Sequence, residues 1–201
     1  MHDTSIIQGF HKEGKGQMKT YWGHQVVDLS RIKAGLGVAW KDSGSILGIS
    51  LNPDPVKARL SLQQRTPLLS MSSAQMPLEL QDQLHAALAG DRVDWTWNPC
   101  LEEGTPFQQQ VWNELLKCSH GYRWSYSELA NRLGKPGASR AVGSACGRNP
   151  HPLRIPCHRI VAADGSLGGF TGDLELKRWL LQKEALLAQA PCSSPNEIEL
   201  L

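Results

Sequence analysis

Residues 125 to 148 combine two predicted helices with a tight turn, and this arrangement constrains the fold more than any other feature of the chain. Ser125 and Glu128 have the Ser-x-x-Glu spacing of a capping box, which predicts that a helix begins there. The helix continues to Leu133 and breaks at Gly134-Lys135-Pro136-Gly137. A second helix is expected from residue 138 to about residue 148. Two helices joined by a short Gly/Pro turn form the helix-turn-helix pattern.

The second helix is rich in small residues around one long side chain, Arg140. The small residues are Ala138, Ser139, Ala141, Gly143, Ser144, Ala145 and Gly147. Glycine lowers helix propensity, so its presence needs a structural reason. Close approach to a nucleic-acid backbone is one explanation, and close packing against another helix is an equally good one.

The charge distribution favours a nucleic-acid partner. Residues 121–159 hold seven Lys or Arg residues and a single acidic residue, Glu128. A basic stretch of this kind suits a polyanion. A solvated basic face without a partner is the alternative. Because the basic stretch overlaps the helix-turn-helix pattern, nucleic acid is the favoured partner.

The rest of the second half is predicted to be mostly helical. Thr105, Pro106 and Gln108 form a second capping box with proline at the first helical position. The apolar residues that follow at helical spacing should be core residues: Phe107, Val111, Trp112, Leu115 and Leu116. A last helix is expected from Asp173, its N-cap, to about residue 189.

The first half is predicted to be a small α/β unit. Two strands, 35–40 and 45–51, flank a hairpin turn at 41–44. Helices are expected at 55–68 and 77–90, and a further strand at 93–97. The chain is therefore expected to be an α/β protein of two domains. The predicted bounds are 1–97 for an N-terminal α/β domain with a loose polar arm, 98–104 for a linker, 105–190 for a helix-turn-helix domain and 191–201 for a flexible acidic tail.

Cys157 is the candidate nucleophile. A cysteine is usually a small buried hydrophobe, and Cys100, Cys118, Cys146 and Cys192 are assigned that role. Among the five cysteines, Cys157 alone combines a preceding proline with a following imidazole and guanidinium, in Pro156-Cys157-His158-Arg159. Positive neighbours and a nearby base favour the thiolate, which is the reactive form.

The cysteine pattern also bears on compartment and metal binding. The chain has five cysteines, no C-x-x-C pair and no apolar stretch near Met1 that could act as a signal peptide. No run of about eighteen apolar residues predicts a membrane span. We therefore expect a reducing compartment, the cytoplasm or, in a eukaryote, the nucleus. No zinc site is expected, because His2, His11 and His24 have no thiolate or carboxylate partners at metal-ligand spacing.

Several sequence blocks occur in an order that resembles a known family. The blocks are Gly104 to Gln108, Val111-Trp112, Ser125-Tyr126, Leu129-Ala130, Arg140 to Gly143, Asn149-Pro150, Pro156 to Arg159, Leu167 to Phe170 and Lys177 to Leu181. Over about residues 104–184 the chain resembles the O6-alkylguanine-DNA alkyltransferases, the suicide DNA-repair proteins. The resemblance implies a ribonuclease-H-like N-terminal domain, a C-terminal domain with a winged helix-turn-helix-like motif, and damage reversal without a cofactor.

The resemblance also implies a role for each catalytic residue. Cys157 would accept the alkyl group from O6 of guanine, with O4-alkylthymine as a second candidate substrate. His158 would take the thiol proton through a water, and Glu184 would hold the imidazole in the required tautomer. Asn149 would brace the Cys157 loop, and Tyr126 would donate to the leaving guanine. A thioether resists hydrolysis, so each molecule would act once.

Double-stranded DNA is the implied partner, bound by a monomer from the minor-groove side, with binding along DNA that could be cooperative. Arg140 would fill the space left by the extruded nucleotide, and Tyr126 would help to rotate that nucleotide out. The other implied DNA contacts are Ser139, Ala141, Gly143 and Arg148. The implied base pocket consists of Pro156, Phe170 and the backbone amide of Thr171.

Two features of the chain depart from the family pattern. Phe170 stands where many relatives have tyrosine. The stretch Cys118-Ser119-His120-Gly121-Tyr122-Arg123-Trp124 replaces a more usual Ile-Pro-Tyr-Gly-x-Thr-x. The entry to the Tyr126 helix is therefore unusual here.

Three other functions compete with alkyl transfer. A non-enzymatic lesion-binding protein of the alkyltransferase-like type would lack the nucleophile, so Cys157 argues against it. A transcription regulator of the related methyl-sensing kind would carry a cysteine-rich zinc module. An unrelated cysteine hydrolase would not need a basic helix-turn-helix.

Overall fold

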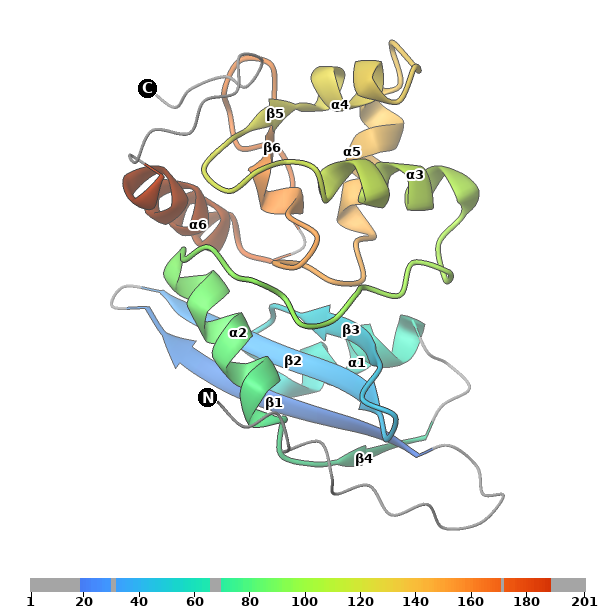
Figure 1. Cartoon of the computed structure of the whole chain (residues 1–201), viewed down its shortest axis with the longest axis vertical. Helices are drawn as coiled ribbons and strands as arrows, with labels where there is room; N and C mark the ends of the chain where they lie inside the picture. Colours follow the sequence, from blue (N-terminus) through green and yellow to red (C-terminus); the bar gives the residue numbers. More distant parts are fainter. Residues whose placement is uncertain (1–18, 30–31, 66–69, 171, 189–201) are drawn as a thin grey trace, which may run out of the picture.

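The computed structural model describes residues 19–29, 32–65, 70–170 and 172–188. Its first half is built on a four-stranded sheet with the order β3-β2-β1-β4. The strands are β1 (Thr20–Asp28), β2 (Lys33–Lys41), β3 (Ile46–Ser50) and β4 (Met71–Ser73). Strand β2 pairs antiparallel with both β1 and β3, whereas β4 lies parallel to β1. Figure 1 shows this sheet below the helices of the second half.

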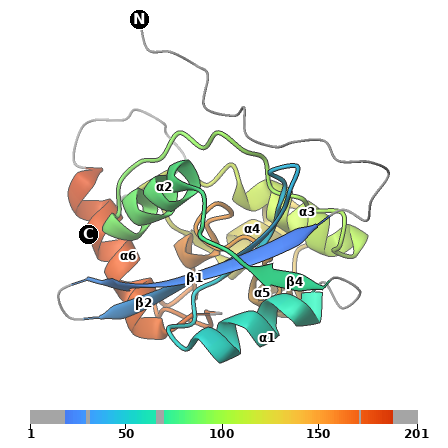
Figure 2. The same cartoon turned by 90° about the horizontal axis from the view of Figure 1, so that it is seen from below.

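Two helices cover opposite faces of the sheet, as Figure 2 shows. They are α1 (Pro55–Arg65) and α2 (Leu78–Ala89). Side chains alternate across a strand, so Leu36, Val38 and Trp40 of β2 join the core with α2. Ala39 faces the other way and packs with Leu62 of α1. The alternation thus supplies apolar side chains to both faces of one strand.

The N-terminal predictions are confirmed in large part. The predicted strands at 35–40 and 45–51 correspond to β2 and β3, and the predicted helices to α1 and α2. Strand β1 was not predicted, because its nine residues include Gly23, His24 and Gln25 and show little alternation. The predicted strand at 93–97 is wrong: these residues pair with no strand, and the Trp95 and Trp97 rings pack edge to face instead.

The second half is mostly helical, as predicted. It contains α3 (Pro106–Leu115), β5 (Trp124–Ser125), α4 (Tyr126–Arg132), α5 (Ser139–Gly147), a 3-10 turn η1 (Cys157–Arg159), β6 (Ile160–Val161) and α6 (Leu174–Leu187). Both predicted capping boxes are confirmed, at Thr105–Gln108 and at Ser125–Glu128. Asp173 caps α6 as expected. Short strands β5 and β6 pair in parallel and bring the start of α4 beside the end of η1.

The core of this half joins α3, α4 and α5 to the segment around Cys157. Val111, Trp112 and Leu115 are buried as predicted, while Phe107 and Leu116 are only partly buried against the same cluster. The Trp112 indole donates to the carbonyl of Ala145, which locks α3 to α5 (2.9 Å).

The two halves share apolar contacts. Leu153, Leu176 and Leu180 belong to the same buried cluster as the sheet and α2. The Ile49 amide of edge strand β3 donates to the carbonyl of Pro150 (2.8 Å). The domain bounds given above stay a prediction, and the expected arm and tail fall almost entirely outside the described residues. No helix in the described part of the chain is long and apolar enough to cross a membrane.

Candidate active site

Cys157 lies at the start of η1, with 4% of its surface exposed. Pro156 precedes this turn and is buried with it, and β6 follows directly, so both ends of the turn are fixed. The approach to the turn is strained. Leu153 has a φ of 74°, rare for a branched side chain, and its side chain is buried in the cluster shared with the sheet.

The Asn149 side chain contacts the loop that carries Cys157. Its side chain is fully buried, and its Nδ2 lies 2.8 Å from the carbonyl oxygen of Ile155 and 3.0 Å from Cys157 Sγ. Its Oδ1 accepts from the amide of His151 (2.9 Å). An amide donor directed at sulfur favours the thiolate over the thiol.

His158 and Glu184 form a buried pair behind the cysteine. His158 Nε2 lies 2.9 Å from Glu184 Oε1, and the two side chains are 2% and 4% exposed. Arg159 holds the same carboxylate through Nε and Nη2, each at 2.9 Å. Arg159 Nη1 also donates to the carbonyl oxygen of Cys118 (2.5 Å). The carboxylate is therefore fixed by an imidazole and a two-pronged guanidinium.

The pKa directions of the pair define its protonation. Burial alone would raise the pKa of Glu184, but His158 and Arg159 outweigh it and leave the pKa well below the usual range. Burial lowers the pKa of His158, against the opposing effect of Glu184. These directions favour a neutral imidazole beside a carboxylate at neutral pH. Since a carboxylate only accepts, Nε2 carries the proton and Nδ1 keeps its lone pair.

Tyr126, the first residue of α4, lies between two glycines. A Cβ on Gly168 would come within 2.8 Å of Tyr126 Cε2 and 2.9 Å of its hydroxyl, while one on Gly143 would lie 3.6 Å from Cε1. Gly168 also has a φ of +61°. Both this backbone conformation and the nearby tyrosine ring therefore require glycine at position 168. The hydroxyl donates to the carbonyl of Gly169 (3.3 Å). Burial raises the pKa of Tyr126, which keeps the phenol protonated and able to donate.

Lys177 is a buried residue of the site that sequence reasoning did not assign. Its side chain is fully buried, and Nζ donates to the carbonyls of Ile160 (2.6 Å), Leu167 and Gly169 (3.2 Å). Burial lowers its pKa, and negative charge on Cys157 or Cys146 would oppose this. One signal in the sequence could have revealed it: Lys177 lies on the apolar stripe of α6 with Leu180, Leu181 and Glu184. A buried ammonium needs such acceptors, so Lys177 fixes the loop that carries Gly168.

Helix α5 presents a polar face away from the core. Val142, Ala145 and Cys146 are buried, whereas Arg140, Ala141, Ser144, Gly147 and Arg148 are exposed. Ser139 and Gly143 are half-buried. Among the described residues nothing lies within 4 Å of a Cβ built on Gly147, so helix packing does not account for that glycine.

The predicted base pocket is described in part. Pro156 is buried beside Cys157, and Phe170 is half-buried against both hydrophobic clusters. Thr171 lies outside the described residues. The structure therefore brings Cys157, His158, Glu184, Asn149 and Tyr126 into one region, with Phe170 at its edge.

Comparisons with known proteins identify the family. A model described as "6-O-methylguanine DNA methyltransferase, DNA binding domain" matches residues 106–186. The chain is 37% identical over 134 residues to the methylated-DNA--protein-cysteine methyltransferase of Salmonella typhimurium, covering 67% of this chain and 78% of that protein. The chain belongs to this methyltransferase family.

Two further matches agree with this assignment. The Shigella flexneri methylated-DNA--protein-cysteine methyltransferase is 41% identical over 115 residues, which is 57% of this chain and 67% of that protein. A crystal structure of Mycobacterium tuberculosis OGT in complex with DNA superposes with a TM-score of 0.66 at 33% identity, covering 84% of this chain and 96% of that one. The expected α/β fold of the family is thereby confirmed.

The other described cysteines lack the surroundings of Cys157. Cys100 is exposed, and Cys118 and Cys146 are buried. Burial raises the pKa of Cys146 strongly, which keeps it a thiol. Cys192 lies outside the described residues. Within the part of the chain that the structure describes, no group of three or more His, Cys, Asp or Glu side chains could hold a metal ion.

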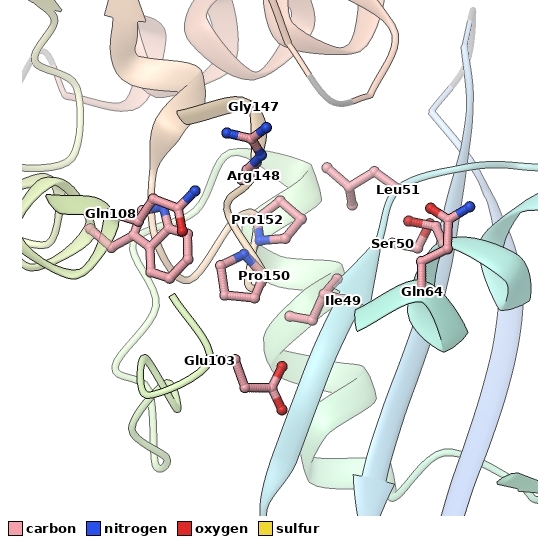
Figure 3. Close-up of a pocket in the computed structure, with 12 residues that line it drawn as sticks. Ile49, Ser50, Leu51, Gln64, Glu103, Gln108, Gly147, Arg148, Pro150 and Pro152 are labelled. Atoms are coloured by element: carbon pink, nitrogen blue, oxygen red, sulfur yellow. The ribbon is translucent and has the colours of Figure 1, made fainter. Parts of the chain in front are cut away.

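A second cleft, of about 520 Å³, has no Cys157 in its lining and lies between the two halves of the molecule. Figure 3 shows Ser50, Leu51 and Gln64 on one side, Gln108 on the other, and Arg148 above the two prolines between them. Arg148 Nη1 also donates to Ser144 Oγ (3.2 Å). Arg148, a predicted DNA contact, thus lies where the exposed face of α5 meets the N-terminal half.

Proposed function

We propose that this protein reverses alkylation damage by transferring the alkyl group from O6 of guanine in duplex DNA to Cys157, irreversibly and once per molecule. The observation that carries the proposal is the buried Cys157 thiol, held by Asn149 and placed beside the His158–Glu184 pair. The names of the relatives support the same reaction, and the solved OGT–DNA complex supports DNA as the partner.

The first step is removal of the thiol proton. His158 is neutral, and with Nε2–H directed at Glu184 its Nδ1 lone pair can receive a proton through a water. The Asn149 amide then stabilises the sulfur anion. The proton leaves His158 for solvent.

The second step is substitution at the alkyl carbon. The sulfur electron pair forms the new S–C bond, and the pair of the broken C–O bond stays on the guanine. The leaving purine is anionic until it gains a proton, so a nearby donor lowers the barrier. The Tyr126 phenol is protonated and can be that donor once it gives up its contact with Gly169. Guanine is restored, Tyr126 regains a proton from solvent, and the cysteine becomes an inert thioether.

The target base must leave the duplex before this chemistry can occur. The exposed face of α5 supplies the residues for it: Arg140 replaces the extruded nucleotide in the stack, and Ala141, Ser139, Gly143 and Arg148 lie along the same helix. A Cβ on Gly147 would meet no described residue within 4 Å, which suits close approach of a DNA strand. The proposed approach is from the minor groove by a monomer. Pro156, Phe170 and Thr171 would line the base pocket, and O4-alkylthymine is a second candidate substrate.

The experiment measures the repaired base in the DNA. A duplex with one O6-methylguanine is incubated with limiting protein, and restored guanine is quantified after digestion to nucleosides. We expect one guanine per wild-type molecule and none for Cys157→Ala, with Cys100→Ser, which removes an exposed thiol, equal to wild type. Retained binding of the duplex by Cys157→Ala shows that it is folded. More than one guanine per molecule, or any conversion by Cys157→Ala, would refute the proposal.

A further inference from the structure

His120 joins the catalytic half to the end of a helix in the N-terminal half. Its Nε2 lies 2.7 Å from the carbonyl oxygen of Gly90, and because a carbonyl only accepts, Nε2 is the donor. Gly90 is the left-handed C-cap of α2, with a φ of 89°. His120 is half-buried and belongs to the stretch 118–124 that departs from the family pattern.

The backbone on both sides of His120 is tied to Glu184. The amide of Gly121 donates to Glu184 Oε2 (3.4 Å). The carbonyl of Cys118 accepts from the same Arg159 that holds both carboxylate oxygens. Gly121 has a φ of +83°, and a Cβ there would lie 2.2 Å from the Cβ of Ala188, so this backbone has little freedom. A shift of residue 120 would therefore reach the carboxylate.

A cavity of about 180 Å³ borders this network on its other side. Its walls include Ala87 and Asp91 at the end of α2, Ser119 and His120 of the loop, and the three residues His158, Arg159 and Glu184. Where a cavity replaces packed side chains, hydrogen bonds carry more of the positioning. His120 lines this cavity, and its partner Gly90 precedes the lining residue Asp91 in the chain.

We propose that His120 is a positioning residue for alkyl transfer: by anchoring residues 118–121 to the end of α2, it holds Glu184 in line with His158. The inference rests on the proposed function and gives the N-terminal half a part in the chemistry without any contact with substrate. It also gives a purpose to the atypical 118–124 stretch.

The charged groups around the pair set the direction of the expected effect. Glu184, Arg159 and Lys177 act on His158, and Arg123 interacts with Glu184. Asp91, Arg92 and Arg154 line the cavity on its remaining sides. Of these groups, only Glu184 raises the pKa of His158. Loss of its alignment therefore lowers the pKa of His158 further and makes it a weaker base.

The experiment compares four proteins in single-turnover transfer from an O6-methylguanine duplex, measured from pH 5.5 to 9. His120→Phe keeps a ring but loses the donor. His120→Gln keeps a donor at similar reach and cannot titrate. The matched control is His24→Ala, which removes another half-buried imidazole bound to a backbone carbonyl (Asn52, 3.0 Å) in the N-terminal half. Thermal unfolding and duplex binding are measured for each.

We expect His120→Phe to transfer about tenfold more slowly than wild type at its plateau. The acid limb of its pH–rate profile should move to lower pH, with duplex binding unchanged. His120→Gln should keep the wild-type rate and profile, as should His24→Ala. This pattern separates positioning from stability, because a purely structural contact would change the unfolding temperature and not the profile.

Three outcomes would overturn the inference. One is a wild-type profile for His120→Phe. Another is the same shift in His120→Gln as in His120→Phe, which would assign the effect to the charge of His120. The third is failure of His120→Phe to fold, which would make the contact structural. Absence of transfer by the wild type would instead overturn the proposed function itself.

Discussion

At the scale of single residues, Glu184 connects most of the site. It accepts from His158 and from two nitrogens of Arg159, and its contacts reach the 118–121 loop. Removing one member of a buried charged pair typically costs about 3–5 kcal/mol, because the partner is left without compensation. Glu184 therefore supports both the tautomer of His158 and the stability of the C-terminal half.

The stability contributed by Glu184 should depend on pH. Its pKa is lower in the folded protein than in the unfolded chain, so the contribution is complete above the ordinary carboxyl range, about 4.3. It is lost as the pH falls below that range. Glu184→Gln should thus lower the free energy of unfolding by about 3 kcal/mol at pH 7 and by progressively less below pH 4. Urea titrations of wild type and Glu184→Gln at pH 7, 4 and 3 measure the difference in their free energies of unfolding. A difference that does not change with pH would contradict a lowered pKa of Glu184.

The residues that the sequence identified are those with strong local signals. Cys157 stands between Pro156 and His158, so its chemistry could be inferred from neighbours in the chain. The partnership of His158 with Glu184 came only from the family resemblance, because 26 positions separate them. Lys177 was not assigned a role, since its three acceptors are backbone carbonyls that leave no trace in residue identity.

Among the helices and strands, those that begin at a local capping motif were predicted correctly. Those that depend on pairing between distant residues were not. Helices α3 and α4 begin at capping boxes whose two members are three residues apart. Strand β1 depends on pairing with β2 and β4, which its own residues do not reveal. The alternation at 93–97 reflects ring contacts, of Trp95 with Arg154 and of Trp97 with His151, and not a sheet.

The loop after β6 should tolerate alanine at one glycine and not at another. Gly165 and Gly168 both have positive φ, of 80° and 61°. A Cβ on Gly168 would meet the ring of Tyr126, whereas one on Gly165 would meet none of the residues that the structure describes within 4 Å. Both alanine variants should lose about 1 kcal/mol of stability through backbone strain. Gly168→Ala should in addition slow alkyl transfer by displacing Tyr126.

Single-turnover rates of alkyl transfer by Gly165→Ala and Gly168→Ala test whether the Gly168 contact positions Tyr126. Gly165→Ala should match the wild type once corrected for the folded fraction. Equal rates for the two variants would mean that the position of Tyr126 does not depend on the Gly168 contact.

At the scale of the whole molecule, the basic stretch and the exposed face of α5 coincide. Arg140 and Arg148 stand at the two ends of that face, and Arg148 reaches the cleft beside the N-terminal half. Affinity for undamaged duplex should therefore fall steeply with salt, because bound phosphates release counterions. The position of Arg148 extends the expected DNA footprint to the junction of the two halves.

Salt titrations of single variants locate the footprint. Arg140→Ala or Arg148→Ala should each make the logarithmic salt dependence shallower by about 1 if the side chain contacts a phosphate. Arg92→Ala, an exposed arginine that follows α2, should leave the slope unchanged. A flat salt response of the wild type would mean that this basic stretch is not a DNA face.

If Cys157 keeps the alkyl group, the mass of the intact protein must increase by that group. Wild type and Cys157→Ala are incubated with excess duplex containing O6-methylguanine, and the intact-protein mass of each is measured by mass spectrometry over time. We expect the wild type to gain one methyl group and no more, with the added mass on the peptide that contains Cys157. Cys157→Ala should bind the duplex without gaining mass. If the wild type binds the lesion and its mass never changes, Cys157 is not an alkyl acceptor and the protein is a lesion-binding module.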